Sequence, residues 1–171
     1  MIALTELNDM ADDSFVDALK DIFEHSPWVA ENVTDTRPFK SVRSLHSAMV
    51  RAVADAPRRA QMDLICAHPD LAGKAALAGE LTDSSTSEQA GAGLDTLSAE
   101  EYEKFHGLNG QYKNKFGFPF ILAVKGHDKH SIMAAFEKRL DNDSEQERIE
   151  ALRQIGEIAR FRLEALLTHE T

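Results

Sequence analysis

Residues 66–74 read Cys66-Ala67-His68-Pro69-Asp70-Leu71-Ala72-Gly73-Lys74, and they interrupt a chain that is otherwise helical in pattern. Proline disfavours helical geometry at the residue before it, so we expect a helix to stop at His68. The imidazole would then project from irregular backbone, in the kind of segment that carries function more often than a core position does. Because an unperturbed imidazole exchanges protons near neutral pH, His68 is the first candidate for an acid/base residue.

Four helices are expected before this break, because apolar residues recur there at helical spacing. Their predicted starts are Asp12 or Asp13 as N-cap, Ser26 as N-cap with Pro27 as first helical residue, about Ser41, and Pro57. The third helix should end near Ala56 and the fourth at His68. Cys66 falls on the last turn of the fourth helix, where we expect a small buried side chain rather than a reactive thiol.

Residues 71–97 differ from the rest, since they are rich in Gly, Ala, Ser and Thr and nearly free of large apolar side chains. A structureless loop of that length is unusual in a compact domain. Within it, Ser85 and Glu88 have capping-box spacing, which predicts a helix start with Glu88 bonded to a backbone amide. The alternative is a polar site, in which hydroxyls, free amides and a carboxylate at a helix N-terminus bind an anionic ligand. Both interpretations can hold together.

Three further helices are expected in the second half of the chain. The first follows a capping box of Ser98 and Glu101, the second carries Ile132, Met133, Phe136 and Leu140, and the third follows a box of Ser144 and Glu147 and turns Ile149, Leu152, Ile155, Ala159, Leu163 and Leu166 inward. No run of alternating strands occurs. The predicted fold class is therefore all-α, as a compact multi-helix single domain over residues 1–171 with irregular loops.

Residues 116–124 form the most apolar segment, and Gly117 and Pro119 argue against a regular helix there. A buried core segment is the plain interpretation. Its irregular backbone must nevertheless find hydrogen-bond partners, and a planar, amide-rich ligand could supply some of them. Arg162, on the last helix, precedes an apolar position and is expected to be partly inward, where it could hold an anion.

Composition excludes several classes of function. The formal net charge is −10 over 171 residues, and no basic stripe interleaved with aromatics occurs, so nucleic-acid binding is not expected. No apolar run is long enough to span a bilayer, and neither a secretory signal nor a peroxisomal C-terminal tripeptide is visible. With one cysteine, no intrachain disulfide can form, which fits a cytoplasmic protein.

Two other classes remain open on the residues alone. His127 and Asp128, with His106 and with Asp141 or Asp143, could be the ligands of a metal-dependent phosphohydrolase, although His127 and Asp128 are more simply a loop and a helix cap. A non-enzymatic helical interaction module with an acidic face is the other alternative. The module would have an exposed apolar groove, and the phosphohydrolase would bind metal.

Four motifs in order make the chain similar to a known family. Residues 26–31, 68–74, 85–89 and 116–126 together resemble the OHCU decarboxylases, which act on 2-oxo-4-hydroxy-4-carboxy-5-ureidoimidazoline in the last ring-modifying step from urate to (S)-allantoin. The likeness runs from about Leu7 to Leu167. It implies a compact all-α fold, a homodimer, and catalysis without a metal or an organic cofactor.

The resemblance also implies roles for particular residues. His68 would be the acid/base residue and Glu88 would assist it. The substrate site would be lined by Pro69, Ser85, Thr86, Ser87, Glu88, Gln89, Phe120, Ile121, Leu122, Ala123, Val124 and Arg162. The implied partners are a small ureidoimidazoline substrate and a second copy of the chain, with neither nucleic acid nor membrane.

Overall fold

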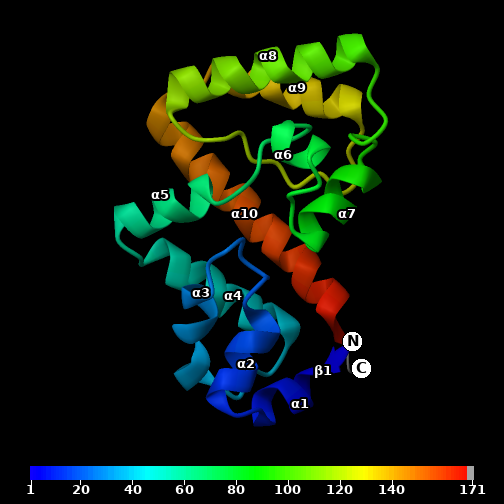
Figure 1. The fold of residues 1–171 in the computed structure, drawn as a ribbon. Coiled ribbons are helices and arrows are strands. Elements are labelled where there is room, and N and C mark those ends of the chain that lie inside the picture. The colour runs from blue at the N-terminus through cyan, green and yellow to red at the C-terminus, as the bar shows by residue number, and fades with distance from the viewer. Residues whose placement is uncertain (169–171) are drawn as a thin grey trace. The chain divides into compact units, whose positions relative to one another are not determined.

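The computed structural model describes residues 1–168 and is helical nearly throughout (Figure 1). Residues 169–171, which were not expected to form a peroxisomal tripeptide, lie outside the described part. Contacts divide the chain into two compact units, residues 1–67 with the segment from Gly156 onward, and His68–Ile155. Helix α10 (Ser144–Leu166) begins in the second unit and ends in the first.

The first unit is built from short helices and one pair of very short strands. Its elements are β1 (Ile2–Ala3), α1 (Leu4–Asp9), α2 (Asp12–Leu19), α3 (Trp28–Glu31), the 3-10 helix η1 (Thr34–Thr36), α4 (Val42–Ala54), α5 (Arg58–Cys66), the end of α10, and β2 (Leu167–Thr168). The strands pair in parallel, Ile2 with Leu167 and Ala3 with Thr168. Since each strand has two residues, the all-α prediction is confirmed.

The second unit holds α6 (Lys74–Leu77), α7 (Asp83–Gly91), α8 (Ala99–Phe116), α9 (Lys129–Arg139) and the start of α10. Helices α8 and α9 pack side by side (Figure 1) and are joined by an ion pair of Lys129 with Glu101 at 2.6 Å. Aromatic rings fill the core beneath them. Phe120 stacks on Phe136 with ring centroids 3.7 Å apart, and Tyr112 meets both rings edge-on.

Several predicted helix starts are confirmed. Ser41 caps α4, Ser98 and Glu101 form the capping box of α8, and Asp128 caps α9 through the amide of Ser131. Pro57 occupies the N-cap position of α5, as the pattern predicted. Each of these signals involves only residues close to the helix start, so it can be recognised from the sequence alone.

Other predicted starts were wrong by one or more residues. Helix α2 begins at Asp12 after Ala11, so neither acidic side chain is a cap, and Pro27 rather than Ser26 precedes α3. The Ser26 hydroxyl instead donates to the carbonyl of Glu24 at 2.8 Å. This hydrogen bond runs back along the chain, which leaves the hydroxyl oriented away from the helix.

The start of α10 also differs from the prediction, by one residue. Asp143 and Gln146 exchange hydrogen bonds of 2.8 and 3.0 Å between side chain and backbone, so they form the capping box one residue ahead of Ser144. The predicted partner Glu147 is 0% exposed and bonds elsewhere in the core. Ile149, predicted to face inward, is 56% exposed because the buried face of the helix is set by Glu147 and Ala151.

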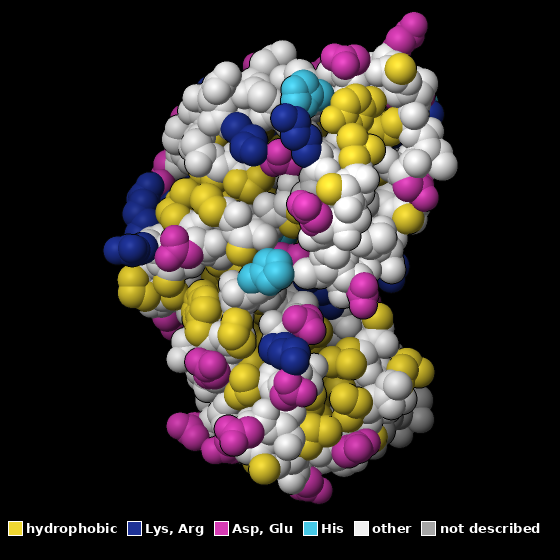
Figure 2. Space-filling model, in the orientation of Figure 1, with side chains coloured by type: hydrophobic (Ala, Val, Ile, Leu, Met, Phe, Trp, Pro, Cys, Tyr) yellow, Lys and Arg dark blue, Asp and Glu magenta, His cyan; other side chains and the backbone are white. Residues whose placement is uncertain are grey.

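Charged side chains on the visible surface agree with the acidic composition. In Figure 2, Lys and Arg side chains lie in small separate groups with Asp and Glu between them. Such a surface offers no continuous basic stripe for a phosphate backbone on that face. Within residues 1–168, no helix is both long enough and apolar enough to cross a bilayer.

Candidate active site

His68 follows the end of a helix, as predicted from Pro69. Helix α5 ends at Cys66, and Ala67 is its C-cap. His68 is only 8% exposed, whereas Pro69 is half-buried and Cys66 is exposed. The prediction of a buried Cys66 was therefore wrong, since the last residue of α5 turns its side chain outward while the residue two positions later turns inward.

The backbone after His68 is tightly constrained. Ala72 has a φ of +51°, a left-handed conformation that is unfavourable for a residue with a Cβ. A Cβ added to Gly73 would lie 2.7 Å from the Cβ of Asp70, so only glycine fits there. The side chain of Asn109 donates to the carbonyl of Leu71 at 2.9 Å, which ties the turn to α8. Strain of this kind is commonly found at functional sites.

Helix α7 starts earlier than the Ser85 and Glu88 spacing predicted. Its N-cap is Thr82, whose hydroxyl accepts from the amide of Ser85 at 3.3 Å, and the amide of Thr86 bonds to the Thr82 carbonyl at 2.9 Å. Glu88 therefore lies inside the helix and not at the predicted capping position, and the amides of Ser85 and Thr86 are not free. Ser85 is buried, Glu88 is half-buried, and Thr86 and Ser87 are exposed.

Gln89 joins α7 to the turn that follows His68. Its side-chain oxygen accepts from the amide of Ala72 at 2.9 Å, and its nitrogen donates to the carbonyl of Asp70 at 3.4 Å. The side chain is buried, so both bonds are shielded from water. The structure thus brings together two of the predicted site segments, the turn at Pro69 and the helix that carries residues 85–89.

The third predicted segment, residues 117–124, is non-helical and mostly buried, as expected; we call it the apolar strip. Gly117 ends α8 with a φ of +78°, a conformation that favours glycine. The strip is held by side chains rather than by regular backbone pairing. The amide of Ala123 donates to Gln154 at 2.8 Å, and Arg139 donates to the carbonyl of Ile121.

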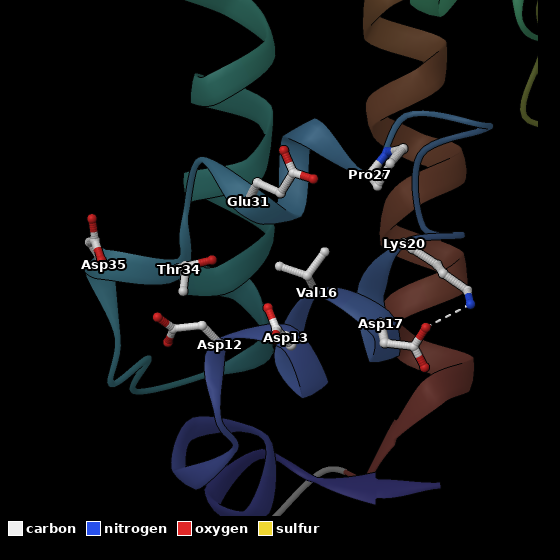
Figure 3. Close-up of a pocket in the computed structure, with 9 residues that line it drawn as sticks. All are labelled: Asp12, Asp13, Val16, Asp17, Lys20, Pro27, Glu31, Thr34 and Asp35. Atoms are coloured by element: carbon white, nitrogen blue, oxygen red, sulfur yellow. Dashed lines mark hydrogen bonds and ion pairs between the residues drawn. The ribbon is translucent and has the colours of Figure 1, made fainter.

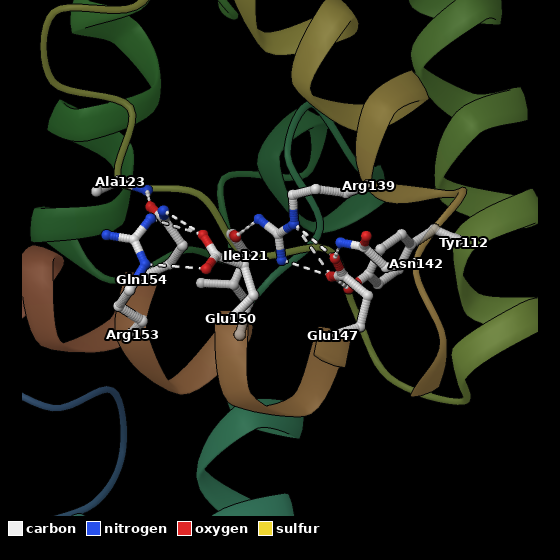
Figure 4. A network of polar contacts seen from close by, with 9 residues as sticks. All are labelled: Tyr112, Ile121, Ala123, Arg139, Asn142, Glu147, Glu150, Arg153 and Gln154. Carbon is white, nitrogen blue, oxygen red and sulfur yellow. Dashed lines mark hydrogen bonds and ion pairs between the residues drawn. The ribbon is translucent and has the colours of Figure 1, made fainter. Parts of the chain in front are cut away.

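Arg139 belongs to a buried polar network that Figure 4 shows beside the apolar strip. Its guanidinium binds both carboxylate oxygens of Glu147, with nitrogen–oxygen distances of 2.7 to 3.1 Å. Asn142 donates to the same carboxylate at 2.9 Å, and Tyr112 donates to it through its hydroxyl. Burial raises the pKa of Tyr112, and its hydrogen bond to Glu147 raises it further, so the phenol stays protonated and remains a donor.

Arg162 lies in the first unit and is buried, which confirms the inward orientation expected of it. One guanidinium nitrogen donates to Glu24 at 2.8 Å and to the carbonyl of Asp21 at 3.1 Å. Glu24 is itself almost fully buried, so the pair is desolvated and its geometry is fixed.

The residues considered as metal ligands are not gathered into a metal site. Among the described residues, no group of three or more His, Cys, Asp or Glu side chains could hold a metal ion. His127 bonds through Nδ1 to the Ser131 hydroxyl at 2.9 Å, and Asp128 caps α9. The hydrogen bond from the Ser131 amide holds the pKa of Asp128 below its usual value, as expected for an N-cap carboxylate. These residues have the structural roles that the simpler interpretation gave them.

An open cavity of about 550 Å³ lies in the first unit and contains none of the predicted site residues (Figure 3). Its lining is mostly acidic and comprises Asp12, Asp13, Val16, Asp17, Lys20, Pro27, Glu31, Thr34 and Asp35. Such a surface would repel an anionic substrate. The candidate active site is therefore the set of segments around His68 and not this cavity.

Comparison with known proteins identifies the class of protein. The family model described as OHCU decarboxylase matches residues 8–164, and the chain belongs to this family. A 2-oxo-4-hydroxy-4-carboxy-5-ureidoimidazoline decarboxylase of Haloferax volcanii is 49% identical over 162 residues, which cover 95% of this chain and 94% of that protein.

Two solved structures are also similar. A crystal structure of (S)-allantoin synthase is 30% identical with a TM-score of 0.79; the match covers 97% of this chain and 54% of that one, so this chain spans about half its length. A crystal structure of OHCU decarboxylase in the presence of (S)-allantoin has a TM-score of 0.71 and covers 92% of this chain and 98% of that one. At 20% identity, this second match supports the fold alone.

The residues that hold the apolar strip were not predicted from the sequence; they are Arg139, Glu147 and Gln154. A signal for two of them was present. Arg139 continues the helical spacing of Ile132 and Phe136, and Glu147 lies one turn before Ala151, so each charge occupies an apolar-face position. Opposite charges on the buried faces of successive helices predict a buried pair, because neither could be buried alone.

Proposed function

We propose that this chain converts 2-oxo-4-hydroxy-4-carboxy-5-ureidoimidazoline to (S)-allantoin by decarboxylation, as a carboxy-lyase of urate degradation. Membership of the family supports the reaction class. The observation that carries the proposal is the buried His68 at a helix end, followed by a strained turn that Gln89 fixes to α7. A rigid, desolvated imidazole is suited to deliver a proton to a defined position.

The reaction requires an electron sink and then a proton. When the bond to the carboxylate carbon breaks, carbon dioxide leaves and the electron pair moves toward the substrate's own ring imine. That imine makes a metal or an organic cofactor unnecessary in this mechanism. His68, as imidazolium, then donates a proton to one face of the ring, which fixes the (S) configuration. Proton transfer by a positioned group contributes about 10²- to 10⁴-fold.

Glu88 and the neighbouring residues of α7 are proposed to assist His68. Glu88 lies within α7 rather than at its N-cap and is half-buried, which supports a role for its carboxylate in orienting or polarising His68. Ser85, Thr86, Ser87, Gln89, Pro69 and the strip residues 120–124 stay predictions as substrate contacts, and so does Arg162. For the strip, the support is its buried backbone, which can match amides of the substrate.

Three broader expectations also stay proposals. We infer a homodimer, a cytoplasmic location and a single domain over residues 1–171. Sedimentation equilibrium would test the dimer, and a single cooperative unfolding transition seen alike by fluorescence and circular dichroism would support one domain. Two separated transitions would contradict it.

The function is tested by supplying the labile substrate directly. Urate is oxidised with uricase and hydrolysed to the ureidoimidazoline, and its decay is followed by circular dichroism with and without the protein. The wild type should form chiral allantoin faster than the spontaneous reaction does. His68→Asn should lower kcat by at least about 100-fold with an unchanged melting temperature. His130→Asn, an exposed histidine on α9, is the matched control and should keep full activity. Racemic product at the spontaneous rate from the wild type would refute the proposal.

A further inference from the structure

Two side chains hold the apolar strip at points two residues apart. Arg139 of α9 donates to the carbonyl of Ile121, and Gln154 of α10 accepts from the amide of Ala123 at 2.8 Å (Figure 4). Both anchoring side chains are buried. The strip has no helix or strand pairing of its own, so these two hydrogen bonds orient the peptide groups around residues 121–123.

The spacing of the anchors leaves one residue between them. In an extended chain, the carbonyl of one residue and the amide of the residue two positions later point to the same edge of the backbone. The amide and the carbonyl of the residue between them point to the opposite edge. Leu122 is that residue, and its backbone forms no hydrogen bond with any other part of residues 1–168. An amide and a carbonyl on one edge form a donor–acceptor pair that matches the edge of a cyclic or ureido amide.

Each anchor is itself fixed by further contacts. The Arg139 guanidinium binds both oxygens of Glu147 and lies 4.4 Å from the centroid of the Phe120 ring, so it packs against the strip that it bonds. The side-chain nitrogen of Gln154 donates to a carboxylate oxygen of Glu150 at 3.0 Å. Both anchors therefore have defined positions before any ligand binds, which lowers the entropic cost of binding.

We propose that Arg139 and Gln154 are positioning residues, which turn the Leu122 amide and carbonyl toward the substrate by bonding the two neighbouring peptide groups. This inference rests on the proposed decarboxylase function. The groups recognised are the ring or ureido amides of the substrate, which do not change during loss of carbon dioxide. Binding of this kind is uniform between the ground state and the transition state, so its loss raises KM and leaves kcat largely unchanged.

The decisive variant is Gln154→Met, which keeps the length of the side chain and removes the acceptor for Ala123. We expect KM to rise about tenfold with kcat within about twofold of the wild type. Gln111→Met, the same replacement at an exposed position of α8, is the control and should change neither constant. A fall in kcat at unchanged KM, or no change in either constant, would overturn the proposal.

A second measurement separates this inference from the proposed function. Amide hydrogen exchange of Ala123 and Leu122 is measured on the ligand-free protein and does not depend on turnover. Gln154→Met should speed exchange at Ala123 at least tenfold while exchange in α8 stays as in the wild type. Arg139→Lys keeps a positive charge beside Glu147 but loses the planar fork, and it should raise KM without abolishing folding. If Gln154→Met leaves exchange at Ala123 unchanged, the positioning role is refuted even when the enzyme is active. If this variant alters exchange at Ala123 but the wild type is inactive, only the proposed function is refuted.

Discussion

Helix α7 and the apolar strip both contribute to the candidate site, yet they acquire their conformations in opposite ways. The helix satisfies its own backbone and starts at a local cap, Thr82. The strip has no regular backbone pairing and depends on Arg139 and Gln154, which lie many residues further along the chain. A change within α7 should therefore have a local effect, whereas the strip should be altered by substitutions far from it in sequence.

The largest expected effect comes from breaking the network behind the strip. Arg139→Met would leave the Glu147 carboxylate buried without its cation, because Glu147 is 0% exposed. Removing one partner of a buried ion pair destabilises a protein by about 3–5 kcal/mol. Urea denaturation measures the change. The control is Arg148→Met, which breaks a pair with the exposed Glu145 and should lose less than about 1 kcal/mol. Equal losses in both variants would show that the buried pair of Arg139 and Glu147 contributes no more to stability than the exposed pair does.

A smaller loss is expected where the helix meets the turn after His68. Gln89→Leu removes the acceptor for the buried amide of Ala72. An unsatisfied buried amide costs about 1–3 kcal/mol, and the loss should appear in denaturant unfolding together with a reduced kcat. The left-handed φ of Ala72 should become harder to keep, so protease cleavage near this turn should increase. Wild-type stability and cleavage in this variant would mean that the Gln89 contacts do not fix the turn.

Removing the cap of α7 tests whether this helix and the apolar strip are independent of each other. Thr82→Ala should lower stability by about 1 kcal/mol, since the hydroxyl that binds the Ser85 amide is lost. Thr82→Ser keeps the hydroxyl and should restore most of that stability. In neither variant should amide exchange at Ala123 change, because the apolar strip does not depend on this cap. Faster exchange there would mean that the two segments are coupled.

The smallest expected effect is on the pH dependence of the free energy of unfolding, through Glu150, which accepts a hydrogen bond from Gln154. The hydrogen bond from Arg153 holds the pKa of Glu150 below its usual value of 4.5, and the bond from Gln154 lowers it further. A carboxylate with a lowered folded-state pKa adds stability that is complete above its ordinary pKa and is lost as pH falls through the folded value. Unfolding free energy measured below about pH 4.5 should therefore fall less steeply in Glu150→Gln than in the wild type. Parallel pH profiles would contradict this assignment.

Local signals allowed much of the fold to be predicted from sequence. Ser98 with Glu101 and Ser41 were identified because a cap needs only residues within one turn of it. Gly117 and Pro119 marked the apolar strip as non-helical for the same reason. His68 was singled out by the proline beside it, and it does follow the end of α5. Its burial was not predicted, and its acid/base role stays a prediction.

What could not be predicted depended on competing or distant partners. Two capping boxes overlap at the start of α10, and Asp143 forms the real one because Glu147 is bound by Arg139 in the core. The spacing of Ser85 and Glu88 was equally misleading, since Thr82 was available one turn earlier. At α10 a contact made elsewhere in the chain, from Arg139 to Glu147, selected one of two local patterns. At α7 two local patterns competed, and the one that begins at Thr82 formed.

The order of the anchors along the chain has a consequence for biosynthesis. Residues 120–124 leave the ribosome before Arg139, Glu147 and Gln154 do, so the growing polypeptide cannot orient this backbone until about thirty further residues have been added. In the meantime a very apolar stretch stands without its polar supports. Nascent chains in which residues 120–124 have emerged from the ribosome and residues 139–154 have not should therefore recruit a chaperone most strongly, and release from it should coincide with emergence of the start of α10.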